Sequence, residues 1–556
     1  MIEDADGAVE NGARLAAAIC IIGGGAAGIT LALELARSRD GILLLEGGGP
    51  QPEPASQALY EGETDDAGRH EAPDRYRQRC FGGATTIWTG RCLPLDPIDF
   101  ERRPYMPGSG WPLRYEDLLP YYERANQICE AGPFAYRAAD ALPGQPASLL
   151  EGFAGGSFAA DRIERFSRPT DFGKRYRGEL AASRRVRVLL HANCTELHAA
   201  AGAIERVGVQ TLAGRSFEVA AGAFVLAVGG LETPRLMLAS RRQRPEGVGN
   251  ERGLVGRFYM CHIAGTLGDF RPSLPRSGLR HAYARSPEGV YCRRRFALTA
   301  EAQRSHQIGN FVARTHHPRI PDPGHRTGAL SAIYLGRNLI PYEITARIRV
   351  DVGRRKQLAH VRNLVLDPWS TTLFMGRMLY GRRIAKRKLP TVVVWPRSRH
   401  FSFDFSVEQQ PNPDSRIVLT ERRDALGMPR LRVEWRHSEL DLRTVRTAFT
   451  LLAEDIAASD CGGVALDDAL SDEAILRDGA QGGHHIGTAR MSDSPATGVV
   501  DRSCRVHGLG NLFVAGSAVF PTSGQANPTL TIVALALRLA DHLAQQAWTV
   551  AAAGWI

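Results

Sequence analysis

The six residues Gly23-Gly24-Gly25-Ala26-Ala27-Gly28 decide the fold of this 556-residue chain. They form a complete G-x-G-x-x-G between an apolar run over residues 17–22, which predicts a buried strand, and residues 29–37, which predict a helix. Glycines at these positions let the backbone approach a pyrophosphate at the positively polarised start of the helix. The motif therefore predicts an α/β fold with a Rossmann-like parallel sheet that binds a dinucleotide through Gly23, Gly25 and Gly28.

The segment after this motif indicates which dinucleotide fits. Residues 42–46 predict a second strand that ends in Glu46, at about the 20-residue distance from the glycines expected of a carboxylate that binds the adenosine ribose. A carboxylate repels a 2'-phosphate, so the sequence favours FAD or NAD over NADP. Strand, helix, second strand and acid are all in place, which disfavours a chance glycine-rich turn.

A second informative block lies near the end of the sequence, in Gly482–Met491, Asn511–Ser517 and Gln525–Thr531. Pro528 fits the first position of a helix with Asn527 as its N-cap, and an apolar run follows. The start of that helix is electropositive. It suits a group that becomes negative during turnover, such as a reduced flavin.

Four segments resemble the glucose–methanol–choline (GMC) oxidoreductases and follow that family's order over nearly the whole chain. They are the N-terminal glycine motif, Phe81–Trp88, Phe224–Arg235 and the C-terminal block. Trp111–Ala125 is most similar to the branch of pyranose oxidases and bacterial sugar dehydrogenases. The resemblance implies FAD, not NAD.

The resemblance also implies roles for individual residues. The catalytic histidine of the family lies four residues before the Thr of a Gly-Thr pair, which here is His484, and Asn527 stands where related members carry a substrate-binding asparagine. The alternative role of Asn527 is to act only as the N-cap of the helix that follows it. We interpret His485 as structural, because neighbouring side chains in an extended segment point opposite ways. The implied cofactor contacts, besides the first motif, are Gly82, Gly83, Thr86, Trp88, Cys194, Gly516, Ser517, Pro528 and Thr529.

One position departs from the pyranose oxidase-like pattern. The histidine that bonds covalently to the flavin in those relatives is replaced here by Ile87, directly before Trp88. Isoleucine cannot form that bond. The sequence therefore predicts non-covalent FAD.

These residues predict the FAD-dependent oxidation of an alcohol to a carbonyl. A proton must leave the hydroxyl while a hydride leaves the same carbon for flavin N5, and a neutral histidine such as His484 suits the proton transfer. The branch resemblance implies a sugar, glycoside or polyol, with O2 or a soluble electron acceptor. The alternatives are a hydrophobic natural-product alcohol, redox-silent hydroxynitrile lyase chemistry and a redox component that depends on a partner.

The sequence predicts two discontinuous domains. Residues 1–100, 185–265 and 476–556 would form the FAD-binding domain, including a β-meander over 202–219, and residues 101–184 and 266–475 an α+β substrate domain. The alternation in 401–408 predicts a half-buried antiparallel strand in that second domain. Residues 416–420 and 431–435 are its predicted neighbours.

Composition limits the remaining possibilities. The chain carries 69 basic and 59 acidic residues, and no nucleic-acid-binding motif accompanies this excess, so we expect no nucleic-acid partner. Nine cysteines are scattered without metal-ligand spacing, which predicts neither a metal site nor a disulfide framework. An acidic start and the lack of about 18 consecutive apolar residues favour a cytoplasmic protein.

The segment 373–388 mixes apolar residues at near-helical spacing with several arginines and lysines. A basic amphipathic helix can contact a membrane or an acidic partner. We favour the alternative, a helix packed in the core with a solvated end.

Overall fold

The predicted strand–glycine–helix unit is present at the start of the chain. In the computed structural model, which describes residues 1–340, 342–391, 393–480 and 483–548, β2 (Arg14–Ile22) leads through the glycines into α2 (Ala26–Leu35), and β3 (Ile42–Leu45) pairs with β2 in parallel. Residues 17–22 of β2 and all of β3 are buried, because both faces of this sheet are covered. The local pattern was therefore sufficient to predict this unit.

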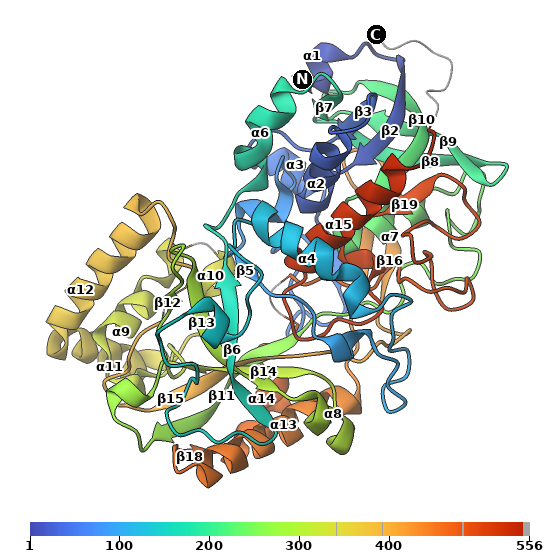
Figure 1. Ribbon diagram of the computed structural model, residues 1–556. Coiled ribbons are helices and arrows are strands. Elements are labelled where there is room, and N and C mark those ends of the chain that lie inside the picture. The colour runs from blue at the N-terminus through green and yellow to red at the C-terminus, as the bar shows by residue number, and fades with distance from the viewer. Residues whose placement is uncertain (341, 392, 481–482, 549–556) are drawn as a thin grey trace.

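A mostly parallel sheet grows outward from β2. Its strand order is β1-β7-β3-β2-β10-β9-β8, with β19 paired to β10 (Figure 1). The parallel strands are β1 (Ile2–Asp4), β7 (Val186–Leu190), β3, β2, β10 (Ser216–Leu226) and β19 (Leu512–Val514). The strand β9 (Ala203–Gln210) pairs antiparallel with β10, and β8 (Asn193–Ala200) pairs antiparallel with β9. These strands form the predicted meander.

A second sheet is entirely antiparallel and forms the lower half of the molecule in Figure 1. Its order is β18-β11-β15-β14-β13-β6-β5, with β12 beside β13. Its strands are β5 (Arg91–Cys92), β6 (Phe158–Phe166), β11 (Ile263–Pro272), β12 (Ala284–Arg285), β13 (Tyr291–Leu298), β14 (Phe311–His316), β15 (Phe401–Val407) and β18 (Gly462–Ala465). The predicted fold class, a Rossmann-like parallel sheet with an antiparallel second part, is confirmed.

The prediction for the neighbours of residues 401–408 is wrong. β15 pairs with β11 and β14, whereas β16 (Arg416–Arg423) and β17 (Pro429–Glu434) pair with each other and with β4 (Glu63–Thr64) in a separate small sheet. β15 is also buried on both faces, except at Asp404. Phe403 and Phe405 pack on Phe449 of α13 (Glu439–Ala458), and the polar face turns toward the interior of the molecule.

Helices join distant parts of the chain around the first sheet. α15 (Thr529–Ala544) packs against α2 and against α4 (Tyr115–Ile128), and α6 (Phe172–Ala182) packs on α2. Residues 101–184, predicted with the substrate domain, thus contribute α4 and α6 to the first sheet's surroundings and β6 to the second sheet. The predicted domain boundaries stay a prediction, and residues 549–556 lie outside the described residues.

The segment around residues 373–388 does not pack in the core. None of the residues of α12 (Pro368–Leu379), all of which the structure describes, is buried, and Leu373, Leu379 and Ile384 are exposed. The core-packed prediction for this segment is therefore wrong. Within the described residues, no helix is long and apolar enough to cross a membrane.

Candidate active site

A cavity of about 630 Å³ lies between the two sheets and joins most of the predicted site residues. Gly23, Gly25 and Glu46 line it at one end, and His484 and Asn527 line it at the other. Cys194, Gly83, Trp88, Gly516, Ser517, Pro528 and Thr529 contribute to the same wall. Gly28, Gly82 and Thr86 are described but do not line the cavity. Gly482, in the C-terminal block, lies outside the described residues.

The first glycine motif forms a cradle that side chains would fill. A Cβ at Gly23, where φ is +109°, would lie 2.6 Å from the carbonyl oxygen of Ala227, and a Cβ at Gly28 would lie 1.8 Å from the carbonyl oxygen of Gly23. Gly25 is the N-cap of α2, and a Cβ there would meet no atom within 4 Å, because its backbone faces the cavity. This bare helix start fits a pyrophosphate.

Glu46 is buried at the same end of the cavity. Its two carboxylate oxygens accept hydrogen bonds from the backbone N–H groups of Gly24 at 2.7 Å and Gly48 at 2.8 Å. Burial raises the pKa of Glu46, although these bonds and Arg79 oppose the shift. Each carboxylate oxygen has a second lone pair, so Glu46 can also accept from ribose hydroxyls.

The segment Phe81–Trp88, which contains four of the implied cofactor contacts, is tightly turned at its start. Gly82 and Gly83 have φ values of +104° and +55°, which favour glycine. The Trp88 indole donates to the carbonyl oxygen of Thr170 at 3.0 Å, which fixes this ring. The Ile87 side chain lines the cavity, and its hydrocarbon offers no atom for a covalent bond to a flavin.

His484 belongs to a hydrogen-bonded chain that defines its proton positions. His262 Nε2 lies 3.4 Å from the carbonyl oxygen of Ser523, which can only accept, so His262 Nδ1 is the unprotonated atom. His484 Nδ1 therefore donates to His262 Nδ1 at 2.7 Å, which leaves a lone pair on His484 Nε2. The Asn527 amide Nδ2 lies 2.9 Å from that atom. His484 thus presents a proton acceptor beside an amide.

The Asn527 side chain has no capping role in this geometry. α15 begins at Thr529 with Pro528 as its N-cap and no side-chain capping bond, one residue later than the sequence predicts. The amide of Asn527 bonds to His484 instead. The backbone N–H groups at the start of α15 still lie at the cavity wall, beside Gly516 and Ser517.

His485 is held by a second hydrogen-bonded chain. His70 Nδ1 donates to the carbonyl oxygen of Glu71 at 2.7 Å, so His70 Nε2 accepts from the Tyr259 hydroxyl at 2.8 Å. The Tyr259 oxygen in turn accepts from His485 Nδ1 at 2.7 Å. This leaves a lone pair on His485 Nε2, which is buried and has no hydrogen-bond partner among the described residues. Both histidines line the cavity, although the two neighbouring side chains were expected to point opposite ways.

Cys261 joins this second chain from a distant part of the sequence. The ligand atoms of His70, Cys261 and His485 lie within 4.8 Å of one another, a geometry that could hold a metal ion. The Tyr259 hydroxyl lies among them, 3.0 Å from the Cys261 sulfur. Sequence spacing could not detect this cluster, and the predicted lack of a metal site stays a prediction.

Burial keeps the histidines of the site neutral. It lowers the pKa of His484 and His485 well below 6.5, and it lowers the pKa of His262 and His70 to about 4. An imidazole with a lowered pKa is unprotonated at neutral pH. Both chains therefore present unprotonated ring nitrogens to the cavity at neutral pH.

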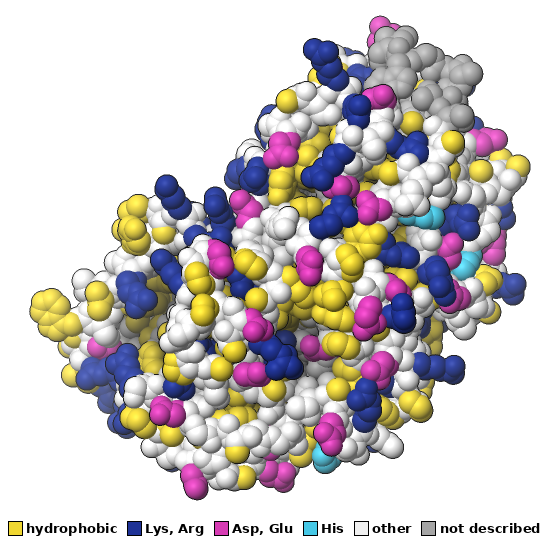
Figure 2. Space-filling model, viewed as in Figure 1, with side chains coloured by type: hydrophobic (Ala, Val, Ile, Leu, Met, Phe, Trp, Pro, Cys, Tyr) yellow, Lys and Arg dark blue, Asp and Glu magenta, His cyan; other side chains and the backbone are white. Residues whose placement is uncertain are grey.

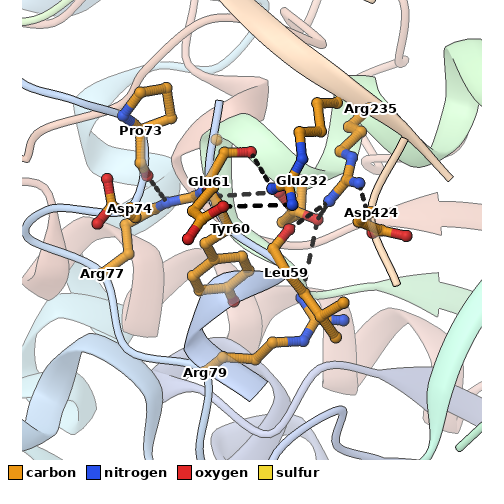
Figure 3. Close-up of polar contacts among 12 residues, drawn as sticks. Leu59, Tyr60, Glu61, Pro73, Asp74, Arg77, Arg79, Glu232, Arg235 and Asp424 are labelled. Carbon is orange, nitrogen blue, oxygen red and sulfur yellow. Dashed lines mark hydrogen bonds and ion pairs between the residues drawn. The ribbon is translucent and has the colours of Figure 1, made fainter. Parts of the chain in front are cut away.

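A cluster of charged residues lies at the dinucleotide end (Figure 3). Arg235 donates to Asp424 at 2.6 Å and to Glu232 at 3.1 Å, and Arg77 donates to Glu232 at 3.3 Å. The Arg77 guanidinium also lies 3.9 Å from the centre of the Tyr60 ring. Arg77, Arg79, Glu232 and Tyr60 line the cavity, and sequence reasoning missed them. For Arg79, the available signal was its position two residues before the segment Phe81–Trp88, which carries implied cofactor contacts.

The opposite wall of the cavity contains polar side chains from the second sheet. Asp404 of β15 pairs with Arg314 at 3.3 Å and with Arg347 at 3.7 Å. Burial raises the pKa of Asp404, but the arginines outweigh it and hold the pKa below its usual range. Asp404 and Arg347 line the cavity, and no sequence motif marks either of them.

Comparisons with known proteins agree with this geometry. Residues 411–536 match the family described as GMC oxidoreductase, and residues 18–317 match the family described as FAD dependent oxidoreductase. The 2-methyl-1,2-propanediol dehydrogenase of Mycolicibacterium austroafricanum is 23% identical over 95% of each chain. The paromamine 6'-oxidase of Streptomyces fradiae is 25% identical over 95% of this chain and 91% of its own. The crystal structure of pyridoxine 4-oxidase from Mesorbium loti, 18% identical, covers 95% of this chain and 99% of its own with a TM-score of 0.53, and so shares the fold.

Proposed function

Because this chain belongs to the FAD dependent oxidoreductases, as a member of the GMC oxidoreductase family, we propose that it oxidises a hydroxyl group of a sugar, glycoside or polyol to a carbonyl. The cofactor is FAD, and its class of reaction is the oxidation of CH–OH groups. Bound FAD supplies the hydride acceptor. The side chains of this protein account for the rest of the chemistry.

His484 is the proposed base. Its Nε2 takes the proton of the substrate hydroxyl, while its Nδ1–H stays bonded to His262 and fixes the ring. With FAD held in the cavity, the carbon of the same CH–OH group would give up its hydride, so proton and hydride would leave from neighbouring atoms. A positioned base of this kind contributes about 10²–10⁴-fold to the rate.

Asn527 is the proposed partner of His484 at the substrate oxygen. Its amide nitrogen lies 2.9 Å from His484 Nε2, so a substrate oxygen beside both groups could replace their direct bond, donate to the imidazole and accept from the amide. The positively polarised start of α15 lies on the same wall and favours negative charge that develops there. This pairing of base and amide is the observation that carries the proposal.

A polyhydroxy substrate fits the opposite wall. Asp404 and Arg347 offer a carboxylate and a guanidinium to the cavity, and such groups bind sugar hydroxyls. The relative from Streptomyces fradiae, whose name gives an aminoglycoside as substrate, supports the same class. A hydrophobic alcohol is the second candidate, because Ile320, Ile333 and Ile348 also line the cavity.

Anaerobic reduction of the bound flavin tests this function. Sugars, glycosides, polyols and lipophilic alcohols are mixed with the protein, and the loss of flavin absorbance is followed. We expect the fastest bleaching with a polyhydroxy compound and a loss of about 10²–10⁴-fold in His484→Ala. His306→Ala, at an exposed position on the helix Ala300–His306, is the matched control. Equal rates in His484→Ala and wild type would refute the base, and bleaching by lipophilic alcohols alone would refute the substrate class.

A further inference from the structure

Most of the excess positive charge of the chain lies in one short segment, residues 353–388. This segment contains ten lysines and arginines and one acid, Asp367, so it carries +9 of the net +10. The remainder of the chain is nearly balanced. The basic balance is therefore a local feature and not a general surface property, contrary to what composition alone suggests.

The same segment exposes an unusual number of large apolar side chains. Ten of the fifteen exposed large hydrophobic side chains among the described residues belong to it. Trp369 is 87% exposed, Val365 72% and Leu373 69%. Apolar groups gathered on one exposed surface mark an interaction site, whereas single exposed apolar groups do not.

Two helices hold these side chains away from the main body. α11 (Gly353–Leu366) and α12 meet at Asp367, and both pack on α9 (Gly328–Leu335), which leaves their outer surfaces uncovered. α12 projects from the side of the molecule in Figure 1. Figure 2 shows hydrophobic atoms at its outer end, with lysine and arginine side chains nearby.

We propose that α11 and α12 dock this protein onto the surface of an anionic phospholipid bilayer. Trp369 and the neighbouring leucines and valines would enter the headgroup region, where an indole has a favourable position. Lys and Arg bury their aliphatic stems beside them while their charged ends reach lipid phosphates. The commitment to lipid rests on this combination, because the exposed basic side chains, among them Arg354, Arg355 and Lys356, complement an anionic surface and the exposed apolar side chains complement its acyl region.

This inference goes beyond the proposed function, because it does not depend on the substrate. The docking helices nevertheless adjoin the active site. Ile333 of α9 and Arg382, just after α12, line the cavity. The proposed docking surface therefore lies next to the wall that faces the substrate.

Co-sedimentation with vesicles tests the docking. The full chain with its FAD is mixed with vesicles of phosphatidylcholine alone or of phosphatidylcholine with phosphatidylglycerol. We expect binding to the anionic vesicles only, weakened by high salt because exposed charges are screened. Two variants test the two kinds of contact. Arg354→Glu/Arg355→Glu/Lys356→Glu reverses charge on α11, and Trp369→Ser/Leu373→Ser removes exposed apolar side chains from α12. Each should lower the vesicle partition coefficient by more than about tenfold.

Matched variants control for charge and for apolar exposure elsewhere. Arg102, Arg177 and Arg184 are exposed outside the segment, and their triple change to Glu removes the same charge. Leu212→Ser removes an exposed leucine from the meander. Both controls should bind as wild type does, and flavin absorbance reports intact folding in every variant.

Three results would overturn the proposal. The first is failure of the wild-type protein to bind anionic vesicles, and the second is an equal loss of binding in the control variants. The third is a dimer in vesicle-free solution, measured by light scattering, that Trp369→Ser/Leu373→Ser converts to monomer. That result would assign the surface to a second copy of the chain.

Discussion

Two buried polar regions meet the same cavity, and they differ in charge. At the catalytic end, burial keeps His484, His485, His262 and His70 neutral, and each bonds to a neutral partner. At the dinucleotide end, Arg235 and Arg77 surround Glu232, so these groups stay ionised. The lone pairs of neutral imidazoles can accept a proton from a substrate, whereas paired ions hold separate segments together. One fold thus places a reactive polar region beside a structural one.

Breaking the ionic region should have the largest effect on stability. Arg235→Met removes the charge that neutralises Glu232 and Asp424 while it keeps much of the side-chain volume. An uncompensated buried charge costs about 3–5 kcal/mol, and urea unfolding would measure the loss. Arg271→Met, which breaks an exposed pair with Asp269, should leave the unfolding midpoint almost unchanged. Similar midpoints for both variants would contradict a structural role of the buried cluster.

Asn527→Ala should produce the next largest effect, on rate and not on stability. Loss of a hydrogen-bond donor to the developing alkoxide costs about 10²–10³ in rate. The side chain makes no capping bond to α15, so the unfolding temperature should stay near that of wild type. Stopped-flow flavin reduction and thermal unfolding separate the two roles. A lower unfolding temperature with an unchanged rate would assign Asn527 to the helix and not to the substrate.

Tyr259→Phe should have an intermediate effect on the neutral region. The change removes the hydroxyl that bonds to His70, His485 and Cys261. It leaves His485 Nδ1 without this partner and His70 Nε2 with only the Cys261 thiol, 4.0 Å away. Each such group costs about 1–3 kcal/mol. Chemical denaturation would measure this loss. Tyr105→Phe removes a hydroxyl that has no partner among the described residues, and it should cost less.

The smallest expected effect is on the pH dependence of stability, which should differ between the neutral region around His70 and the ionic region around Glu232. The pKa of His70 is about 4 in the folded protein and its usual value is 6.5, so the unfolded state binds more protons between these values. Stability should fall as pH drops below 6.5, by about 1 kcal/mol per pH unit for this histidine. The lowered pKa of Glu232 contributes stability that is lost only below pH 4.5.

Unfolding curves between pH 6.5 and 5 check this difference. His70→Gln should flatten the dependence on pH, while Arg235→Met should keep the slope of wild type. An equal slope in His70→Gln and wild type would mean that His70 is not neutral in the folded protein.

The sequence predicts what local motifs determine. The glycines of the first motif and Glu46 specify β2, α2 and β3 because their spacing reflects one continuous supersecondary unit. The partners of β15 were not predictable in this way, since β11 lies more than a hundred residues earlier in the chain. Residues near in sequence formed their own hairpin instead.

Only the site residues that lie within the family's sequence motifs were predictable. Its pattern identified His484 and Asn527, but not the His262 ring that orients His484 or the Tyr259 hydroxyl that holds His485. The helix begins one residue later than predicted, and the Asn527 amide bonds to His484 instead of capping it. Amphipathic spacing in 373–388 identified a helix, yet spacing does not reveal whether another element covers the apolar side chains.

The packing of α15 on α2 has a consequence for the order of events during synthesis. The glycine cradle leaves the ribosome early, whereas β19, His484, Asn527 and α15 follow only near the end of the chain. At translation rates of about 5–20 residues per second, the interval is on the order of a minute. During that time a nascent chain has the first glycine motif but no base for catalysis. Incomplete chains therefore cannot oxidise a substrate, and the first turnover must await the C-terminal helix.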